Sequence, residues 1–151
     1  MKSLDKSFQG SFALQADAQK VLAILKDIKS VEFLAPGVQS VLKMDEQNKE
    51  ALVKLKMSFG SLSFDREVLL SLREIEHGVK LKASTYGLEL EANVFVQKAD
   101  GGCVVNYSVS AKSTSFAGAL VLNAVGDSVV KQFAEEFEQR IKKALLEVHA
   151  F

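Results

Sequence analysis

The feature that most constrains this chain is a long middle region, residues 38–113, in which apolar and polar side chains alternate. The clearest example is a run in which lysines and a serine separate the apolar residues Val53, Leu55, Met57 and Phe59. Alternation with a period of two is typical of a strand with one buried face. Such strands belong to antiparallel sheets that are covered on one side. The region therefore predicts a meander of about six strands with one apolar face.

The register of one hairpin in this region can be predicted in two independent ways. Gly60-Ser61 suits a two-residue hairpin turn with glycine first. Closing the chain there places Met57 opposite Phe64 on the apolar face. It also places Lys56 opposite Asp65 on the polar face, where facing opposite charges stabilise a ladder slightly. The apolar and the charged patterns select the same register.

Helical segments bracket the strands. Residues 7–15 read as a first strand, and Asp17 is a suitable N-cap for a helix that runs to about Ile28. Pro36-Gly37 ends this unit. A long helix is expected over residues 118–148, because apolar residues recur there at steps of three and four. These residues are Val130, Phe133, Phe137, Ile141, Ala144 and Leu145.

The order of elements predicts an α+β fold, in which a curved antiparallel sheet of about seven strands wraps around the long C-terminal helix. We expect residues 1–151 to form a single domain, because the chain has the length of one. A strongly curved sheet cannot pack closely along a whole straight helix. The arrangement therefore predicts a space between sheet and helix.

Composition and motifs exclude several functional classes. The 19 basic and 19 acidic residues balance, so the charge expected of a nucleic-acid binder is missing. No phosphate loop, dinucleotide fingerprint or nucleophile elbow is present. The two histidines and Cys103 lie far apart in the sequence, so no metal site, cofactor or catalytic residue is predicted. The longest apolar run, residues 116–126, is too short to span a bilayer. We expect a cytoplasmic protein with at most peripheral membrane contact.

Two polar residues fall on the expected apolar face. Arg66 lies opposite Leu55, and a buried guanidinium needs partners. Three interpretations are open. Arg66 could anchor a carbonyl, carboxylate or phosphate of a ligand in the cavity. Alternatively it pairs with an acid such as Glu32 or Glu136, or a bulge turns it outward. Tyr107 also points inward by alternation. Its hydroxyl can bind a ligand or, as is commoner for a buried tyrosine, a protein group.

Several strings of the sequence are similar to those of a known family. They are FQGSFAL at 8–14, VLAILKD at 21–27, FLAPGVQSV at 33–41, FGSLSF at 59–64 and the segment 116–137. Their order resembles the helix-grip, START-like (SRPBCC) superfamily, which includes polyketide cyclases and Bet v 1-like proteins. Within it, the chain resembles the G-subunit family of carbon monoxide dehydrogenase. Leu-x-Pro-Gly-Val at 34–38 is the most recognisable of these strings.

The resemblance implies a cavity for a small hydrophobic ligand, lipid-like or quinone-like, and an accessory role beside a molybdenum-containing carbon monoxide dehydrogenase or a related oxidoreductase. The residues expected to line the cavity are aromatic or otherwise apolar, with Arg66 and Tyr107 as the polar exceptions. They are Met57, Phe59, Phe64, Arg66, Tyr107, Phe116, Phe133 and Phe137.

Two alternatives to a carrier remain open. One is a cyclase or aromatase type of enzyme, although the acids of the strands are all expected to face outward. The other is a ligand-free docking or assembly protein. The apolar segment 116–125 could then contact a partner, the membrane or a second copy of the chain, whereas in a carrier it could form a lid.

Overall fold

The computed structural model describes residues 5–59, 62–85 and 87–149. Its elements follow the predicted order of strand, helix, six strands and long helix. They are β1 (Asp5–Leu14), α1 (Ala18–Lys26), the 3-10 turn η1 (Ile28–Ser30), α2 (Val31–Leu34), β2 (Val38–Asp45), β3 (Glu50–Phe59), β4 (Leu62–Ile75), β5 (Gly78–Thr85), β6 (Leu88–Ala99), β7 (Gly102–Ser113) and α3 (Phe116–His149).

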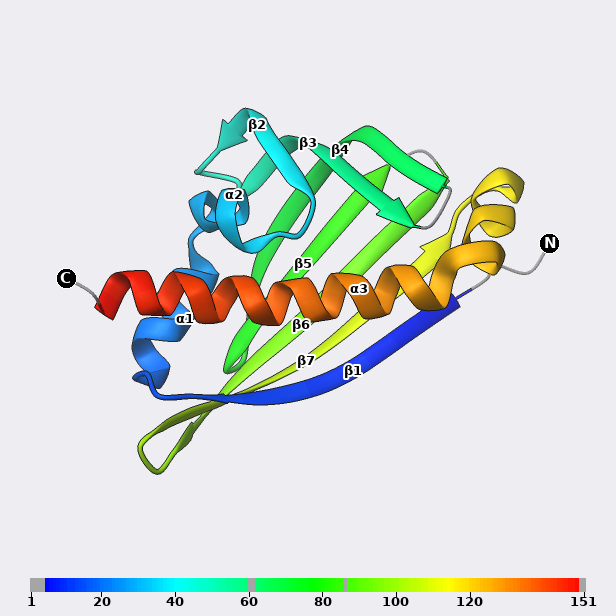
Figure 1. The fold of residues 1–151 in the computed structure, drawn as a ribbon. Helices are drawn as coiled ribbons and strands as arrows, with labels where there is room; N and C mark the ends of the chain where they lie inside the picture. Colours follow the sequence, from blue (N-terminus) through cyan, green and yellow to red (C-terminus); the bar gives the residue numbers. More distant parts are fainter. Residues whose placement is uncertain (1–4, 60–61, 86, 150–151) are drawn as a thin grey trace.

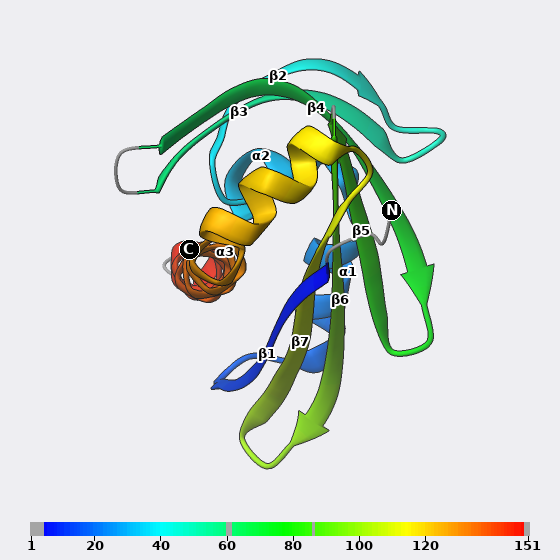
Figure 2. The same cartoon turned by 90° about the vertical axis from the view of Figure 1, so that its right-hand side faces the viewer.

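The seven strands form one antiparallel sheet in the order β1-β7-β6-β5-β4-β3-β2. Strands β2 to β7 pair with their neighbours in the sequence, whereas β1 pairs with β7 at the far end of the meander. The sheet curves around α3, which crosses its inner face (Figures 1 and 2). The predicted fold, a curved sheet wrapped around a long helix, is confirmed.

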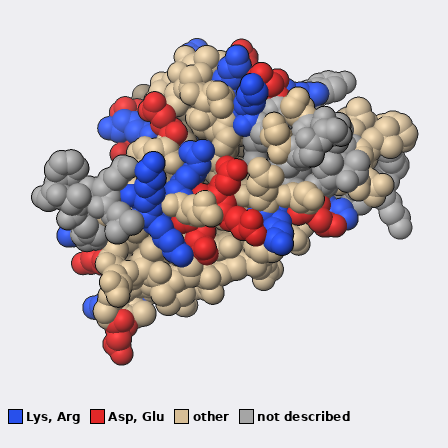
Figure 3. Space-filling view, in the orientation of Figure 1, with Lys and Arg blue, Asp and Glu red and all other residues tan. Residues whose placement is uncertain are grey.

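The register predicted for the β3–β4 hairpin is confirmed at every position used to derive it. Met57 faces Phe64, and Lys56 faces Asp65. The turn residues 60–61 lie outside the described part of the chain. Charged side chains of the strands alternate out of the sheet into solvent. Among them, Lys80 on β5 and Glu91 on β6 form an ion pair, with 3.1 Å between Nζ and Oε1. Figure 3 shows basic and acidic side chains interspersed on the face that carries α3.

The segment between β1 and β2 closes one end of the sheet. Asp17 caps α1 by accepting a hydrogen bond from the Gln19 backbone N–H at 2.8 Å. The helix ends at Lys26, before the expected Ile28. At this point Asp27 starts the 3-10 turn by accepting from the Lys29 N–H at 3.0 Å. A third short helix, α2, follows directly. Three short helices joined by tight turns can follow the curved sheet, which one straight helix cannot.

The long helix α3 places its apolar stripe on β1 and β7. Of the predicted stripe, Phe137 is half-buried and the other five residues are buried, with Val130 and Ile141 at 1% exposure or less. The first part of α3 runs at an angle to the rest (Figure 2). No helix among residues 5–149 as described combines the length and the apolar character needed to cross a membrane.

Candidate functional site

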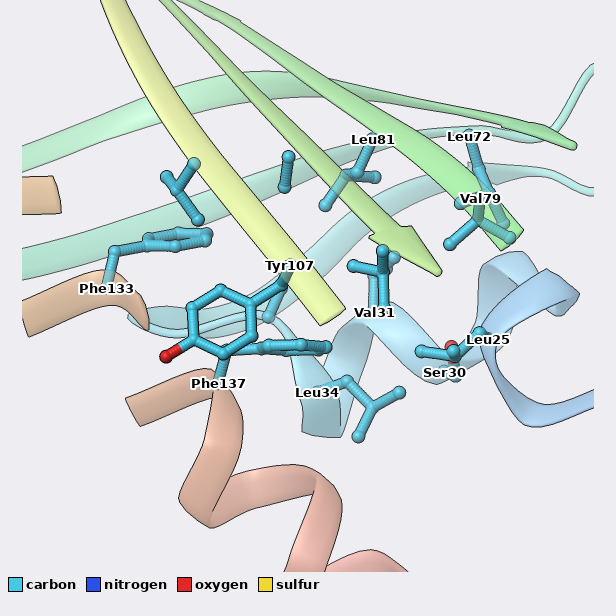
Figure 4. A pocket seen from close by; sticks show the side chains of 14 residues that line it. Leu25, Ser30, Val31, Leu34, Leu72, Val79, Leu81, Tyr107, Phe133 and Phe137 are labelled. Carbon is cyan, nitrogen blue, oxygen red and sulfur yellow. The ribbon is translucent and has the colours of Figure 1, made fainter. Parts of the chain in front are cut away.

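A cavity of about 50 Å³ lies between the inner face of β4–β7, the three short helices and the middle of α3. Apolar side chains make almost all of its wall (Figure 4). The lining residues are Leu25, Ser30, Val31, Leu34, Ala35, Leu72, Val79, Leu81, Ala92, Val94, Tyr107, Val109, Phe133 and Phe137. The space predicted between the sheet and the long helix is therefore present.

Tyr107 forms the wall of the cavity on the side of β1. Its ring contacts Phe12 at 5.9 Å between centroids, and it meets Phe137 edge-on at 6.2 Å. The ring lies where Gly10, its partner on β1, has no side chain. The hydroxyl points away from the other lining residues (Figure 4). Tyr107 therefore gives the cavity an aromatic face and directs its polar atom elsewhere.

Burial raises the pKa of the Tyr107 hydroxyl, and the negative charges of Glu138 and Glu135 raise it further. The residue stays a neutral phenol at physiological pH. A neutral phenol with a raised pKa is a poor general base at pH 7.

The structure separates the predicted site residues into three groups. Tyr107, Phe133 and Phe137 line the cavity, as expected. The side chains of Met57, Phe59 and Phe64 lie outside the described part of the structure. Phe116 is 66% exposed at the start of α3 and does not border the cavity.

Arg66 occupies the predicted register position opposite Leu55, but its side chain is exposed and not buried. It is absent from the cavity wall. Leu72, a lining residue, lies six positions further along β4, which corresponds to about 20 Å along the strand. The expectation of a buried cavity anchor is therefore wrong for the cavity observed. Leu55, its partner across the ladder, is buried at 4% exposure, so a register position on the inner face does not by itself determine the burial of a long arginine side chain.

The sequence analysis missed the wall contributed by the short helices. Leu25, Ser30, Val31 and Leu34 form one side of the cavity. They lie on three consecutive short helices, α1, η1 and α2, and the sequence analysis proposed none of them as a lining residue. A signal that could have identified this wall is Ser30, a polar residue among the apolar residues of these helices. It is buried, with 5% exposure.

The size of the cavity limits what it holds in this conformation. Pockets for cofactors and drug-sized ligands measure roughly 300–1,000 Å³. An engineered apolar cavity that binds benzene measures about 150 Å³. A lipid or quinone needs a larger space than the 50 Å³ present. Phe137 on α3 and Leu81 on β5 are half-buried, whereas the other lining residues are buried.

Groups suited to catalysis are scarce around the cavity. Among the described lining residues, Tyr107 alone has a titratable side chain, and its hydroxyl points away. No group of His, Cys, Asp and Glu residues suited to a metal ion occurs among the residues that the structure describes. Cys103 is buried, and burial raises the pKa of its thiol, so it is a poor nucleophile.

Comparison with solved structures places this architecture in a known class. The chain is similar to a conserved protein from Geobacillus kaustophilus, with a TM-score of 0.70, 14% identity, and coverage of 95% of this chain and 96% of that one. It is also similar to norcoclaurine synthase from Thalictrum flavum, with a TM-score of 0.71, 13% identity and 99% coverage of both chains. The di-domain ARO/CYC protein StfQ of the steffimycin biosynthetic pathway matches with a TM-score of 0.66 and 13% identity, over 98% of this chain and 53% of StfQ.

These likenesses define the fold as a helix-grip domain of the START-like, Bet v 1-like class. No curated protein matches the chain in sequence. A family model does match it. Residues 10–146 match the model of the carbon monoxide dehydrogenase G subunit (CoxG), so the chain belongs to the CoxG family.

Proposed function

We propose that this protein binds and carries a small hydrophobic molecule, lipid-like or quinone-like, in the cavity between the sheet and α3. The observation that supports this proposal is the chemistry of the cavity wall, where twelve of the fourteen lining side chains have no polar atom. A ligand enters by displacing the half-buried wall at Phe137 and Leu81. Burial of apolar surface then drives binding.

Membership of the CoxG family supports a more specific form of this proposal, in which the protein works beside an oxidoreductase. As a member of the CoxG family, the protein delivers its ligand to, or receives it from, a carbon monoxide dehydrogenase or a related oxidoreductase. Phe116 and Leu120 are 66% and 58% exposed in the first turns of α3. Exposed apolar residues of this size suit a contact with such a partner. Loss of partner binding in a Phe116→Ser, Leu120→Ser double variant, with ligand binding unchanged, would separate the two roles.

The carrier function is tested by native mass spectrometry of freshly purified protein, followed by organic extraction. We expect a discrete added mass that extracts as a neutral apolar compound. A protein that stays ligand-free with a panel of quinones and lipids would overturn the proposal. The docking function would then be the better explanation.

The location of the ligand is tested with a matched pair of variants. Ala92→Val adds two methyl groups at the cavity wall, where Ala92 is 8% exposed. Ala13→Val makes the same change at an exposed position of β1. We expect Ala92→Val to weaken binding at least about tenfold by filling the cavity, and Ala13→Val to have no effect. Equal binding by both variants would exclude the cavity as the site.

A further inference from the structure

Ser30 brings a hydroxyl into a wall that is otherwise carbon. It lines the cavity at the junction of η1 and α2, beside Leu25 and Val31 (Figure 4). With 5% exposure it is one of the two buried polar residues among those described, the other being Ser113 on β7. A serine hydroxyl in an apolar wall can form a hydrogen bond with a polar group that enters the cavity.

The local backbone does not use this hydroxyl. Ser30 is the N-cap of α2, but its φ of −68° and ψ of −17° are helical, and its side chain makes no cap hydrogen bond. A capping side chain requires an extended N-cap residue, as at Asp17. The Ser30 backbone N–H is satisfied by the Asp27 carbonyl at 2.9 Å. Helix formation alone therefore does not explain a serine at this position.

The other polar candidates do not reach the cavity. The Tyr107 hydroxyl points away from it, and Arg66 lies about 20 Å along β4 from the lining residue Leu72. Within the described part of the chain, no lysine, arginine or histidine borders the cavity. A carboxylate or phosphate inside would be a buried charge without a partner, which is strongly unfavourable. A neutral oxygen is compatible with this wall, because a serine hydroxyl both donates and accepts hydrogen bonds.

We propose that Ser30 binds the polar end of the ligand, and that the cavity selects a neutral apolar molecule with one hydrogen-bonding oxygen, a ketone or quinone carbonyl or an uncharged hydroxyl. The oxygen lies toward η1 and α2, and the apolar body lies against Phe133 and Phe137. This inference rests on the proposed carrier function and adds the ligand's orientation and charge. It also assigns the polar contact to Ser30 instead of Arg66.

Three probes of nearly equal shape test this assignment. They are 2-acetylnaphthalene, 2-isopropenylnaphthalene, in which a methylene group replaces the carbonyl oxygen, and 2-naphthoate, which carries a charge. Dissociation constants are measured by NMR titration at pH 7 for the wild type, Ser30→Ala and Ser113→Ala. Ser113 is 3% exposed and lies outside the cavity wall, so its variant controls for the loss of a buried hydroxyl.

We expect Ser30→Ala to weaken binding of the ketone about 3- to 10-fold, the effect of one neutral hydrogen bond, and to change binding of the alkene less than about 2-fold. Ser113→Ala should leave the ketone-to-alkene ratio unchanged. The wild type should bind the naphthoate at least about tenfold more weakly than the ketone.

The outcomes separate the two proposals. If the wild type binds the alkene and the ketone, but Ser30→Ala weakens both equally or neither, the role of Ser30 is refuted and the carrier function stands. Tight binding of the naphthoate refutes the selection of neutral ligands. If the wild type binds none of the probes although native mass spectrometry shows a bound lipid or quinone, the role of Ser30 is refuted and the carrier function stands. If it binds neither the probes nor any lipid or quinone, both are refuted.

Discussion

Gly10 and Tyr107 provide the sharpest test of the packing that shapes the cavity. The two residues face each other across the β1–β7 ladder. A Cβ atom on Gly10 would overlap the Tyr107 hydroxyl oxygen and would lie 2.6 Å from Cζ and 3.2 Å from Cε1. The ring cannot move aside freely, because Phe12 and Phe137 hold it. Gly10→Ala should therefore destabilise the protein and push the ring toward the cavity.

The expected magnitude is a difference between two effects. Replacing glycine by alanine within a strand normally stabilises by about 0.5–1 kcal/mol. Overpacking a well-filled site costs about 1–3 kcal/mol. We therefore expect a net loss of about 0.5–2 kcal/mol in the free energy of unfolding. At about 2–4 °C per kcal/mol for a domain of this size, the midpoint of thermal unfolding falls by roughly 1–8 °C.

The control is a double-mutant cycle with Tyr107→Leu, measured by urea unfolding. The shorter leucine does not reach Gly10, so Gly10→Ala should become neutral or stabilising by up to about 1 kcal/mol in that background. The resulting coupling is about 0.5–3 kcal/mol. Gly10→Ala that stabilises the wild type, or that costs the same in both backgrounds, would refute the proposed packing.

Three further variants test other parts of the structure. Burial, and secondarily the negative charge of Asp17, raise the pKa of the Cys103 thiol, so this group contributes stability that is intact below pH of about 9 and is lost as the pH rises further. Urea unfolding from pH 7 to 10.5 should show this loss in the wild type relative to Cys103→Ala; a pH-independent difference would contradict it. Gly118→Ala would drive a Cβ into the Gly87 carbonyl oxygen, a backbone atom that cannot give way. It should therefore cost more stability than Gly101→Ala. At Gly101 no atom lies within 4 Å of the added Cβ, and only the φ of +78° is unfavourable. Equal midpoints of thermal unfolding for these two variants would argue against a tight contact between α3 and the β5–β6 turn. Arg66→Met should leave the affinity for 2-acetylnaphthalene within about twofold of the wild type, because Arg66 does not border the cavity; a tenfold loss, or 1.4 kcal/mol, would restore it as an anchor.

The strands and their register were predictable because several local signals agree. In the β3–β4 hairpin, the turn glycine, the apolar face and the facing charges all select one pairing, and the structure has that pairing. The apolar stripe of α3 was likewise recognised from its spacing. Each of these signals is carried by residues near one another in the chain.

The site was less predictable because burial depends on what covers a face. Arg66 has the correct register, yet it is exposed although its partner Leu55 is buried. Tyr107 was correctly placed on the inner face, yet the direction of its hydroxyl depends on Gly10, nearly a hundred positions away in the chain. The wall that contains Ser30 forms where three short helices meet the sheet. The contacts of Arg66 and Tyr107 leave no local pattern in the sequence.

The pairing of β1 with β7 has a consequence for how the chain folds. The meander β2–β7 is built from hairpins between neighbours, which can form while the chain leaves the ribosome. The first strand is synthesised before all of them, yet its partner lies roughly a hundred positions later, so closing that loop carries a large entropic cost. Until β7 is complete, β1 with Phe8 and Phe12 has no sheet to join, and α3 lacks one of the two strands on which it packs. The cavity is thus completed by the last steps of folding. We expect a nascent chain that stops before β7 to expose its apolar face to chaperones.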